Sequence, residues 1–308
     1  MEIIESAAGC RALLDRARAA GRTVGLVPTM GALHDGHTSL LARARTECDV
    51  VAVSIFVNPL QFGDPEDIAR YPRTLERDLL VCAESGADVV FVPSVREMYP
   101  SWPAAPSTTV SVRGVSAGWE GASRPGHFDG VATVVAKLFT IAGTCRAYFG
   151  LKDFQQLAVV RRMALELSLP VELVGCPIVR EADGLALSSR NVRLSPAERQ
   201  AATVLSRALA AGRAALLAGE RSGAVVGRAM RAVVAAEPAV EIDYAVVVDA
   251  DSLEEVVALG DVASVRLLIA AQVGPVRLID NCAALRAADD AHAVPGANEQ
   301  VRQLERIG

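Results

Sequence analysis

Two histidines near the amino terminus are the side chains best placed by type and spacing to do chemistry. The turn Met30–Ser39 reads Met-Gly-Ala-Leu-His-Asp-Gly-His-Thr-Ser and contains His34 and His37, two of the four histidines in the chain. An apolar run precedes this turn and a helix-like stretch follows it, which predicts a strand, a Gly-rich turn and a helix. The first N–H groups of a helix lack helical partners and, with the helix dipole, favour an anion such as phosphate. The turn therefore predicts a nucleotide-binding site.

Two other interpretations of His34 and His37 remain open from these residues alone. The pair could bind a metal ion, but zinc normally takes a third protein ligand, and no His-Glu-x-x-His spacing supplies one. The pair could also be two surface imidazoles without a chemical role. Gly36 favours the phosphate interpretation, because a residue without a side chain lets a ligand approach the backbone closely.

A second cluster, Gly150–Gln156, is predicted to follow a strand and begin a helix. Lys152 could offer a positive charge to a phosphate, and Asp153 could accept a hydrogen bond from a ribose hydroxyl. Gly150 would leave room for the nucleotide. The alternative is an ordinary Lys-Asp helix start.

A third cluster, Arg180–Asn191, joins the two predicted domains. It ends in two hydroxyls, a guanidinium and an amide, from Ser188, Ser189, Arg190 and Asn191. Such donors suit a departing pyrophosphate, whose negative charge grows as it leaves. A loop between domains can also close over a nucleotide and exclude water. The alternative is a solvated turn.

Two further sets of polar residues could contact an organic acid. The segment Arg124–Gly130 could hold a substrate carboxylate, or it could cap the following helix through Asp129. Gln61 and Gln156 are neutral amides, which can hydrogen-bond a hydroxy acid without pairing with it as an ion.

The first part of the chain predicts alternating strands and helices. Strands are expected at 23–29, 50–57, 88–93, 146–149 and 171–174, and helices at 5–20, 39–48, 74–86, 129–143 and 154–168. A long loop is expected at 96–125, with a short strand at 109–113. This alternation predicts an α/β fold with a Rossmann-like, doubly wound parallel sheet. Ligands bind beyond the carboxyl ends of such strands, where the histidine turn, Asn58–Phe62 and Gly150–Asp153 are all predicted to lie.

The pattern changes after Pro177. Helices are expected at 195–218 and 223–236, and strands at 241–248, 264–271 and 276–279. We therefore expect a Rossmann-like domain at 1–176 and a smaller α+β lid domain at 177–282. The Ala-, Asp- and Gln-rich residues 283–308 are expected to form a flexible tail.

The composition limits the classes of function. The 308 residues are 51% hydrophobic and 4% aromatic, and the net charge is −5. No basic run resembles a nucleic-acid footprint, so no nucleic-acid partner is expected. The six cysteines form no Cys-x-x-Cys pair, which is typical of reduced thiols in a cytoplasmic protein. No apolar run is long enough for a membrane span, so no membrane partner is expected either.

Six motifs closely resemble the pantothenate synthetase family, and the match spans residues 23 to about 280, in order and without large gaps. They are Pro28–His37, Phe56–Phe62, Tyr71–Thr74, Arg124–Phe128, Lys152-Asp153-x-x-Gln156 and Leu187–Asn191. The resemblance implies membership of the class I aminoacyl-tRNA-synthetase-like nucleotidyltransferases. It also implies an ATP-dependent ligase that joins pantoate to β-alanine through a pantoyl adenylate and releases pyrophosphate and AMP. Mg²⁺ would accompany ATP, with no metal held by protein side chains alone, and the family suggests a homodimer.

The resemblance also implies roles for individual residues. His34 and His37 would stabilise the transition state, with His37 as the family's proton donor, and Gln61 and Gln156 would hold pantoate, Gln61 also lying near β-alanine. Lys152, Ser188, Ser189 and Arg190 complete the expected catalytic set. The expected ATP contacts are Met30, Gly31, Ala32, Leu33, His34, Asp35, Gly36, His37, Gly150, Leu151, Lys152, Asp153, Val179, Leu187, Ser188, Ser189 and Arg190. Val179 would pair with adenine through its backbone.

Two residues depart from the commonest family pattern. Leu151 stands where a polar Glu or Gln is frequent, and Leu187 stands where Met is usual. The second exchange conserves volume and is expected to matter little. The first removes a polar group beside Lys152 and bears on ATP affinity.

Two other functions are compatible with some of these motifs. One is a nucleotidyltransferase that adenylates a phosphate in place of a carboxylate. The other is a regulatory module that binds ATP without chemistry, which would not need so many phosphate donors. An aminoacyl-tRNA synthetase is disfavoured, because the chain is acidic and too short for an anticodon-binding domain.

Overall fold

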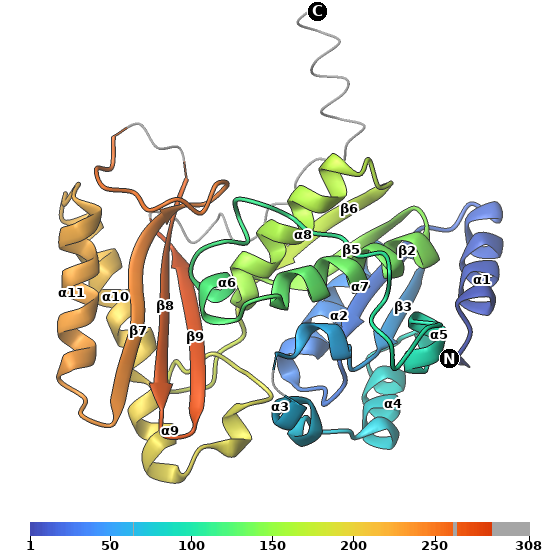
Figure 1. Ribbon diagram of the computed structural model, residues 1–308, viewed down its shortest axis with the longest axis horizontal. Coiled ribbons are helices and arrows are strands. Elements are labelled where there is room, and N and C mark those ends of the chain that lie inside the picture. Colours follow the sequence, from blue (N-terminus) through green and yellow to red (C-terminus); the bar gives the residue numbers. More distant parts are fainter. Residues whose placement is uncertain (64, 261–263, 285–308) are drawn as a thin grey trace, which may run out of the picture. The chain divides into compact units, whose positions relative to one another are not determined.

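The computed structural model describes residues 1–63, 65–260 and 264–284, which form two compact units (Figure 1). The first unit contains Met1–Gly150 and Gln156–Cys176. The second contains Leu151–Gln155 and the described residues from Pro177 onward. The short segment Leu151–Gln155 therefore packs with the second unit, although it follows a strand of the first. The tail expected at 283–308 lies outside the described residues, apart from its first two positions.

The first unit is built on a six-stranded sheet in which every pairing is parallel. Its order is β1-β4-β3-β2-β5-β6. The strands are β1 Glu2–Ile4, β2 Val24–Thr29, β3 Val50–Ile55, β4 Val89–Phe91, β5 Cys145–Gly150 and β6 Val171–Cys176. The α/β prediction is confirmed, and β6 forms one edge. The edge strand β1 was not predicted.

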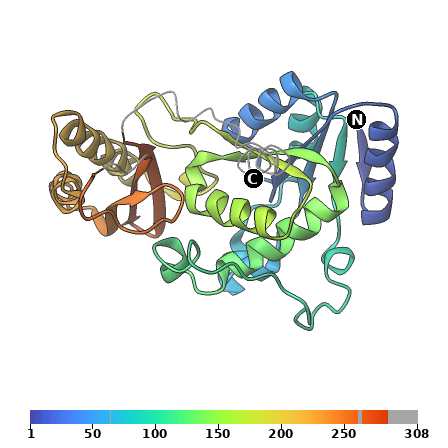
Figure 2. The same cartoon turned by 90° about the horizontal axis from the view of Figure 1, so that it is seen from above.

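Helices cover both faces of this sheet (Figure 2), and this explains why β2 and β3 are almost wholly apolar. Helix α2 packs against β2, β3, β5 and β6, whereas α1 and α7 pack against each other and β2. The helices are α1 Ala7–Ala19, α2 Asp35–Glu47, α3 Pro65–Arg70, α4 Leu75–Glu84, α5 Val95–Met98, α6 Glu120–Ser123, α7 His127–Ala142 and α8 Phe154–Glu166, with 3₁₀ turns η1 Pro59–Gln61 and η2 Leu151–Asp153.

The strand order places the polar loops at a topological switch point. From β2 the chain proceeds to β3 and β4 on one side, and later to β5 and β6 on the other. Ligands of open α/β sheets bind beyond the carboxyl ends of the strands at such a reversal. The histidine turn follows β2, Asn58–Phe62 follows β3, and Gly150 ends β5. The prediction that these loops follow neighbouring strand ends is confirmed.

The structure corrects three local predictions. Residues 109–113 do not form a strand. The Val110 N–H instead donates to the Thr133 hydroxyl on α7, and this hydroxyl donates back to the Val110 carbonyl. Helix α7 begins at His127, with Gly126 at its N-cap, so Asp129 lies inside the first turn and does not cap it. The loop expected at 96–125 also contains the short helices α5 and α6.

The second unit packs helices on a three-stranded antiparallel sheet of order β7-β8-β9. The elements are η3 Asn191–Arg193, α9 Pro196–Ala202, α10 Val204–Leu217, α11 Gly223–Ala235, β7 Val240–Asp249, β8 Val265–Val273 and β9 Val276–Ala283. One predicted helix is thus divided into α9 and α10. Ser195 caps α9 through a reciprocal bond with Glu198. The α+β architecture is as predicted.

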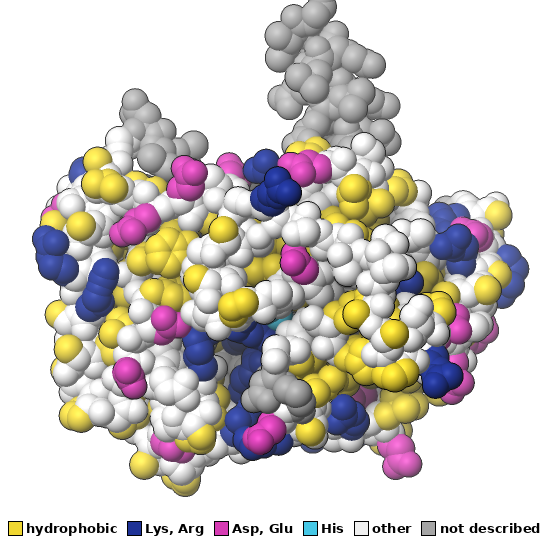
Figure 3. All heavy atoms as spheres, viewed as in Figure 1, with side chains coloured by type: hydrophobic (Ala, Val, Ile, Leu, Met, Phe, Trp, Pro, Cys, Tyr) yellow, Lys and Arg dark blue, Asp and Glu magenta, His cyan; other side chains and the backbone are white. Residues whose placement is uncertain are grey.

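All six cysteines lie in the described part of the chain and are free thiols. Burial raises the pKa of Cys10, Cys82 and Cys176 to about 11. No helix in the described ranges is long and apolar enough to cross a membrane. On the face shown in Figure 3, hydrophobic side chains and charged side chains of both signs are intermingled.

Candidate functional site

The histidine turn begins helix α2 through its own side chains. His34 is the N-cap residue, and its Nδ1 accepts the N–H of Gly36 at 3.1 Å. The Nδ1 of His37 accepts the N–H of His34 at 3.3 Å, and the ring centroids are 4.2 Å apart. Because each Nδ1 accepts a hydrogen bond, a neutral ring carries its proton on Nε2. Each ring can therefore donate from Nε2 toward an anion at the helix start.

Asp78 holds the backbone that leads into this turn. Its carboxylate is 1% exposed and accepts the N–H groups of Ala32 at 2.9 Å and Leu33 at 2.8 Å. Gly31 and Ala32 both have positive φ, and a Cβ on Gly31 would lie 2.9 Å from the Asp78 Oδ2. A side chain at residue 31 would thus be strained and crowded. Asp78 was missed by the sequence analysis; the available signal was an acid four residues before Cys82 on the buried face of α4.

Gln61 lies in a buried amide network at the carboxyl end of β3. The Asn58 side-chain amide donates to the Gln61 Oε1 at 3.1 Å and to the Gly130 carbonyl at 3.0 Å. The Tyr99 hydroxyl donates to the Asn58 Oδ1 at 2.8 Å, and burial raises the pKa of Tyr99, which keeps this donor protonated. The Gln61 Nε2 faces the Met30 Sδ at 2.9 Å. The network links the β3 loop to the first residue after β2.

Two residues of the Arg124–Gly130 motif fix the backbone of Gln61. The His127 Nδ1 donates to the Gln61 carbonyl at 2.8 Å, and the Arg124 guanidinium bonds the His127 Nε2 at 3.1 Å. Gly130 allows close packing, since a Cβ there would lie 2.3 Å from the Leu60 carbonyl oxygen. The structure thus gives this motif a contact with Gln61 that neither interpretation from the sequence had anticipated.

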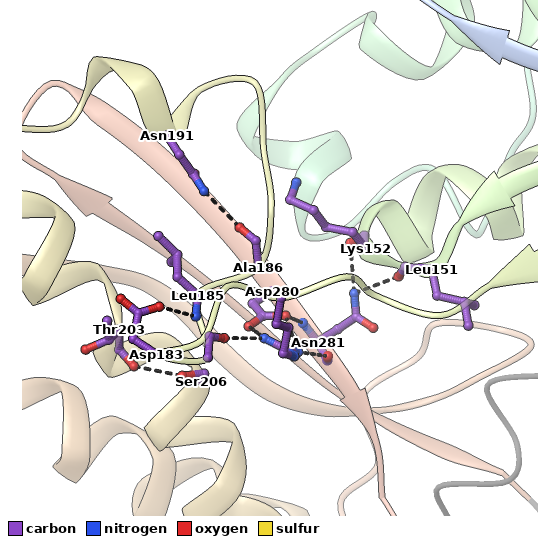
Figure 4. Close-up of polar contacts among 12 residues, drawn as sticks. Leu151, Lys152, Asp183, Leu185, Ala186, Asn191, Thr203, Ser206, Asp280 and Asn281 are labelled. Atoms are coloured by element: carbon purple, nitrogen blue, oxygen red, sulfur yellow. Dashed lines mark hydrogen bonds and ion pairs between the residues drawn. The ribbon is translucent and has the colours of Figure 1, made fainter. Parts of the chain in front are cut away.

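In the second unit, the Lys152 segment is held by its backbone (Figure 4). The Asn281 side-chain amide donates to the carbonyls of Leu151 at 2.9 Å and Lys152 at 2.8 Å. The Lys152 ammonium extends away from this contact and lies 3.7 Å from the Asp153 Oδ1. Leu151 is 4% exposed, so an apolar residue suits this position.

The residues that precede Ser188 form a short hairpin. Arg180 pairs with Ala186 in an antiparallel bridge, and the Leu187 N–H donates to the Val179 carbonyl at 3.0 Å. The Ser188 hydroxyl accepts the Arg190 N–H at 3.2 Å, which shapes the following turn. Ser188, Ser189 and Arg190 are all half-buried.

Charged groups brace this hairpin. The Arg199 guanidinium pairs with Asp183 and Glu181, each at 2.6 Å. The hydrogen bond from Arg199 lowers the pKa of Asp183. The Asn191 side-chain amide donates to the Ala186 carbonyl at 3.1 Å. Asn191 therefore links the end of this loop to the hairpin strand that contains Ala186.

The predicted site residues fall into two groups, one in each unit. The first unit contains Met30–His37, Gln61, Gly150 and Gln156, and the second contains Leu151–Asp153, Val179 and Leu187–Arg190. Among the residues that the structure describes, no group of three or more His, Cys, Asp or Glu side chains could hold a metal ion.

Comparison with known proteins gives a consistent result. The family model described as pantoate-beta-alanine ligase matches residues 2–283. A pantothenate synthetase from Roseiflexus sp. (strain RS-1) is 56% identical over 260 residues, which cover 84% of this chain and 92% of the relative. One from Heliobacterium modesticaldum is 53% identical over 281 residues, covering 91% of this chain and 98% of the relative.

Solved structures agree with these sequence matches. A pantothenate synthetase of Thermus thermophilus is 49% identical, with a TM-score of 0.86 over 93% of this chain and all of that chain. The pantoate-beta-alanine ligase of Francisella tularensis, crystallised with beta-gamma ATP and beta-alanine, is 31% identical. Its TM-score is 0.73 over 92% of this chain and 97% of that chain.

Proposed function

This chain belongs to the pantoate–β-alanine ligase family, and from that premise we propose how its residues divide the work of the reaction. The enzyme joins pantoate to β-alanine with consumption of ATP and forms pantothenate, AMP and pyrophosphate. The observation that carries the proposal is the pair of histidines at the start of α2, whose Nδ1 atoms each accept a backbone N–H. A neutral ring that accepts at Nδ1 carries its proton on Nε2.

In the first step, a carboxylate oxygen of pantoate attacks the α-phosphorus of ATP, and the bond to the pyrophosphate oxygen breaks. Negative charge grows on the departing pyrophosphate, so donors already in place lower the barrier. We assign this role to His34, His37 and Lys152. Ser188, Ser189 and Arg190 contribute further donors to the same phosphates. His37 acts as the proton donor of the set.

In the second step, the β-alanine amine attacks the acyl carbon of the pantoyl adenylate. The new amide bond forms as the acyl–oxygen bond breaks, AMP leaves, and the amine nitrogen loses one proton to solvent. Gln61 and Gln156 hold the hydroxyl-bearing pantoyl group in both steps, and Gln61 also lies near the amine. An amide suits this task because it can both donate and accept a hydrogen bond.

The remaining predicted ATP contacts are with the backbone, the sugar and the base. Gly150 and Asp153 face the ribose, while Val179 and Leu187 contact adenine. The other residues of the histidine turn contact the ATP phosphates; they are Met30, Gly31, Ala32, Leu33, Asp35 and Gly36. Leu151 contributes through its backbone, because its side chain is buried.

We also assign a metal ion, a location and an assembly. Mg²⁺ prefers oxygen ligands and keeps several waters, so it enters with the ATP phosphates and not through a protein cage. Residues 177–282 form the smaller domain and contribute Val179 and Leu187–Arg190 to ATP binding. The enzyme works in the cytoplasm as a homodimer, as the family resemblance suggests.

Isotope exchange tests the order of the two steps. With ATP, Mg²⁺ and pantoate alone, the protein should exchange labelled pyrophosphate into ATP, because the adenylate forms before the amine is needed. Release of AMP and pantothenate should require β-alanine in addition. Exchange that appears only after β-alanine is added would refute the two-step assignment.

Two substitutions test the assigned donors. His37→Ala and Lys152→Ala each remove a donor to charge that develops in the transition state, so kcat should fall by roughly 10²–10³-fold. The exchange assay measures this loss directly. Near-native turnover in either variant would remove that residue from the catalytic set.

A further inference from the structure

Two consecutive polar residues, Asp280 and Asn281, are buried in the middle of strand β9. Asp280 is 4% exposed and Asn281 is 2% exposed. Neighbouring residues of a strand point to opposite faces of its sheet. Buried polar groups therefore occupy both faces of β9 at this point. Because burying an unpaired polar group costs free energy, we expect both side chains to be hydrogen-bonded.

Asn281 engages both the donor nitrogen and the acceptor oxygen of its amide on, or beside, the Lys152 segment. Its Nδ2 donates to the carbonyls of Leu151 and Lys152, at 2.9 Å and 2.8 Å. Its Oδ1 accepts from the Arg266 Nε at 2.7 Å, and the Arg266 guanidinium stacks 4.1 Å from the ring centre of Phe154. Figure 4 shows the two bonds from Asn281 to turn η2. Asn281, together with Arg266, thus holds turn η2 and Phe154, the residue after it.

Asp280 holds the other ATP-contacting segment of this unit. It forms a two-pronged ion pair with the Arg180 guanidinium, at 2.6 Å and 2.9 Å. Arg180 also donates to the Gly184 carbonyl at 3.0 Å, within the hairpin that leads to Leu187 and Ser188. The two segments are therefore anchored on adjacent residues of a single strand.

We propose that Asp280 and Asn281 are a pair of positioning residues, which hold the Lys152 turn and the hairpin before Ser188 in the arrangement that ATP chemistry needs. The inference rests on the function proposed above for Lys152 and Ser188. A lysine ammonium sits at the end of a flexible four-carbon stem, so its reach is set by the position of its backbone. A shift of about 1 Å in a catalytic group can lower a rate by about 10²-fold.

A cycle of single and double variants tests the Asn281 part of the proposal. Asn281→Leu keeps a similar side-chain volume and removes both N–H donors of the amide. If Asn281→Leu is not recovered folded, Asn281→Asp, which keeps the side-chain shape, is used in its place. Pyrophosphate exchange with saturating pantoate is measured in the wild-type and Lys152→Ala backgrounds. Substitution of Asn281 should lower kcat by about 10²-fold in the wild-type background. In the Lys152→Ala background the loss should be less than about threefold, because the effects of two substitutions that act through the same group are not additive.

Asp280→Asn tests the other arm, and Asp243→Asn is its matched control. Asp243, on β7, pairs at 2.6 Å with Arg277, which lies on β9 as Asp280 does. The Asp243 side chain is 39% exposed. Asp280→Asn should raise the KM for ATP several-fold, whereas Asp243→Asn should leave it unchanged. Urea midpoints of all variants separate a loss of fold from a loss of positioning.

The outcomes are distinguishable. An equal rate loss from the Asn281 substitution in both backgrounds, or no loss in the wild-type background, would overturn the inference and leave the proposed function intact. An unchanged KM for ATP in Asp280→Asn would overturn its second arm. Near-native exchange by Lys152→Ala alone would overturn the proposed role of Lys152 and the inference with it.

Discussion

Asp78 offers a quantitative test of how the histidine turn is held. Asp78→Asn exchanges one acceptor oxygen for an NH₂ group, so either the Ala32 N–H or the Leu33 N–H faces a donor. Leaving one buried donor unsatisfied costs about 1–3 kcal/mol. With a urea slope of about 2 kcal/mol per molar, the unfolding midpoint should fall by roughly 0.5–1.5 M. The tryptophans Trp102 and Trp119 both belong to the first unit, so their fluorescence reports its unfolding.

The same variant should lower pyrophosphate exchange at urea concentrations where the protein stays folded. The reason is that the Asp78 carboxylate fixes the two residues that precede His34. Asp49→Asn is the matched control: its carboxylate accepts the N–H and hydroxyl of Thr23, but at the amino ends of β2 and β3 and in an exposed position. It should leave exchange unchanged. If Asp78→Asn moves the midpoint but keeps native exchange, the carboxylate does not position the histidine turn for the proposed chemistry and the reasoning is refuted.

Three further outcomes are expected. Gln61→Ala should raise the KM for pantoate and leave calorimetric binding of a non-hydrolysable ATP analogue unchanged; an equal loss of ATP affinity would move Gln61 out of the pantoate site. The native protein should react slowly with an aromatic disulfide reagent at pH 8, because burial raises the pKa of thiols such as Cys82 and Cys176 to about 11, and all six cysteines should react in guanidinium. Asp183→Asn should lower stability at neutral pH, since the hydrogen bond from Arg199 lowers the pKa of this carboxyl. The stabilisation by this bond is present above the pKa of about 3.9 that Asp183 has in the unfolded chain, and it is lost as pH falls through the lower pKa of the folded state. Urea midpoints of the wild type and the variant that still differ at the lowest pH would contradict the assigned role of the Asp183 carboxylate.

Much of the fold could be predicted because its determinants are local. The apolar runs of β2 and β3, and the Gly- and His-bearing turn between strand and helix, are recognisable within a dozen residues. The strand expected at residues 109–113 was wrong for the opposite reason. Their backbone partner is a hydroxyl 23 residues away on a helix, and no local pattern reports such a contact.

The candidate site divides in the same way. Residues expected to touch ATP or pantoate carry recognisable side chains at fixed spacing, so the motif around His37 or Lys152 could be identified from the sequence. The residues that hold them could not. Asp78 binds backbone 45 and 46 residues away, and Asn281 binds backbone 129 and 130 residues away.

A physical reason connects these two unpredicted residues. The segments beyond the carboxyl ends of the strands must be irregular to leave space for a ligand, so their N–H and C=O groups are not paired within a strand or a long helix. When such a segment is buried, side chains must satisfy its backbone groups. Asp78 accepts from two successive N–H groups at the end of β2, and Asn281 donates to two successive carbonyls at the end of β5. A carboxylate suits the two N–H donors of the first loop, and an amide nitrogen suits the two carbonyl acceptors of the second. If the two side-chain types were exchanged, an N–H donor of the first loop would face an amide NH₂ group, and the carbonyls of the second loop would face a carboxylate.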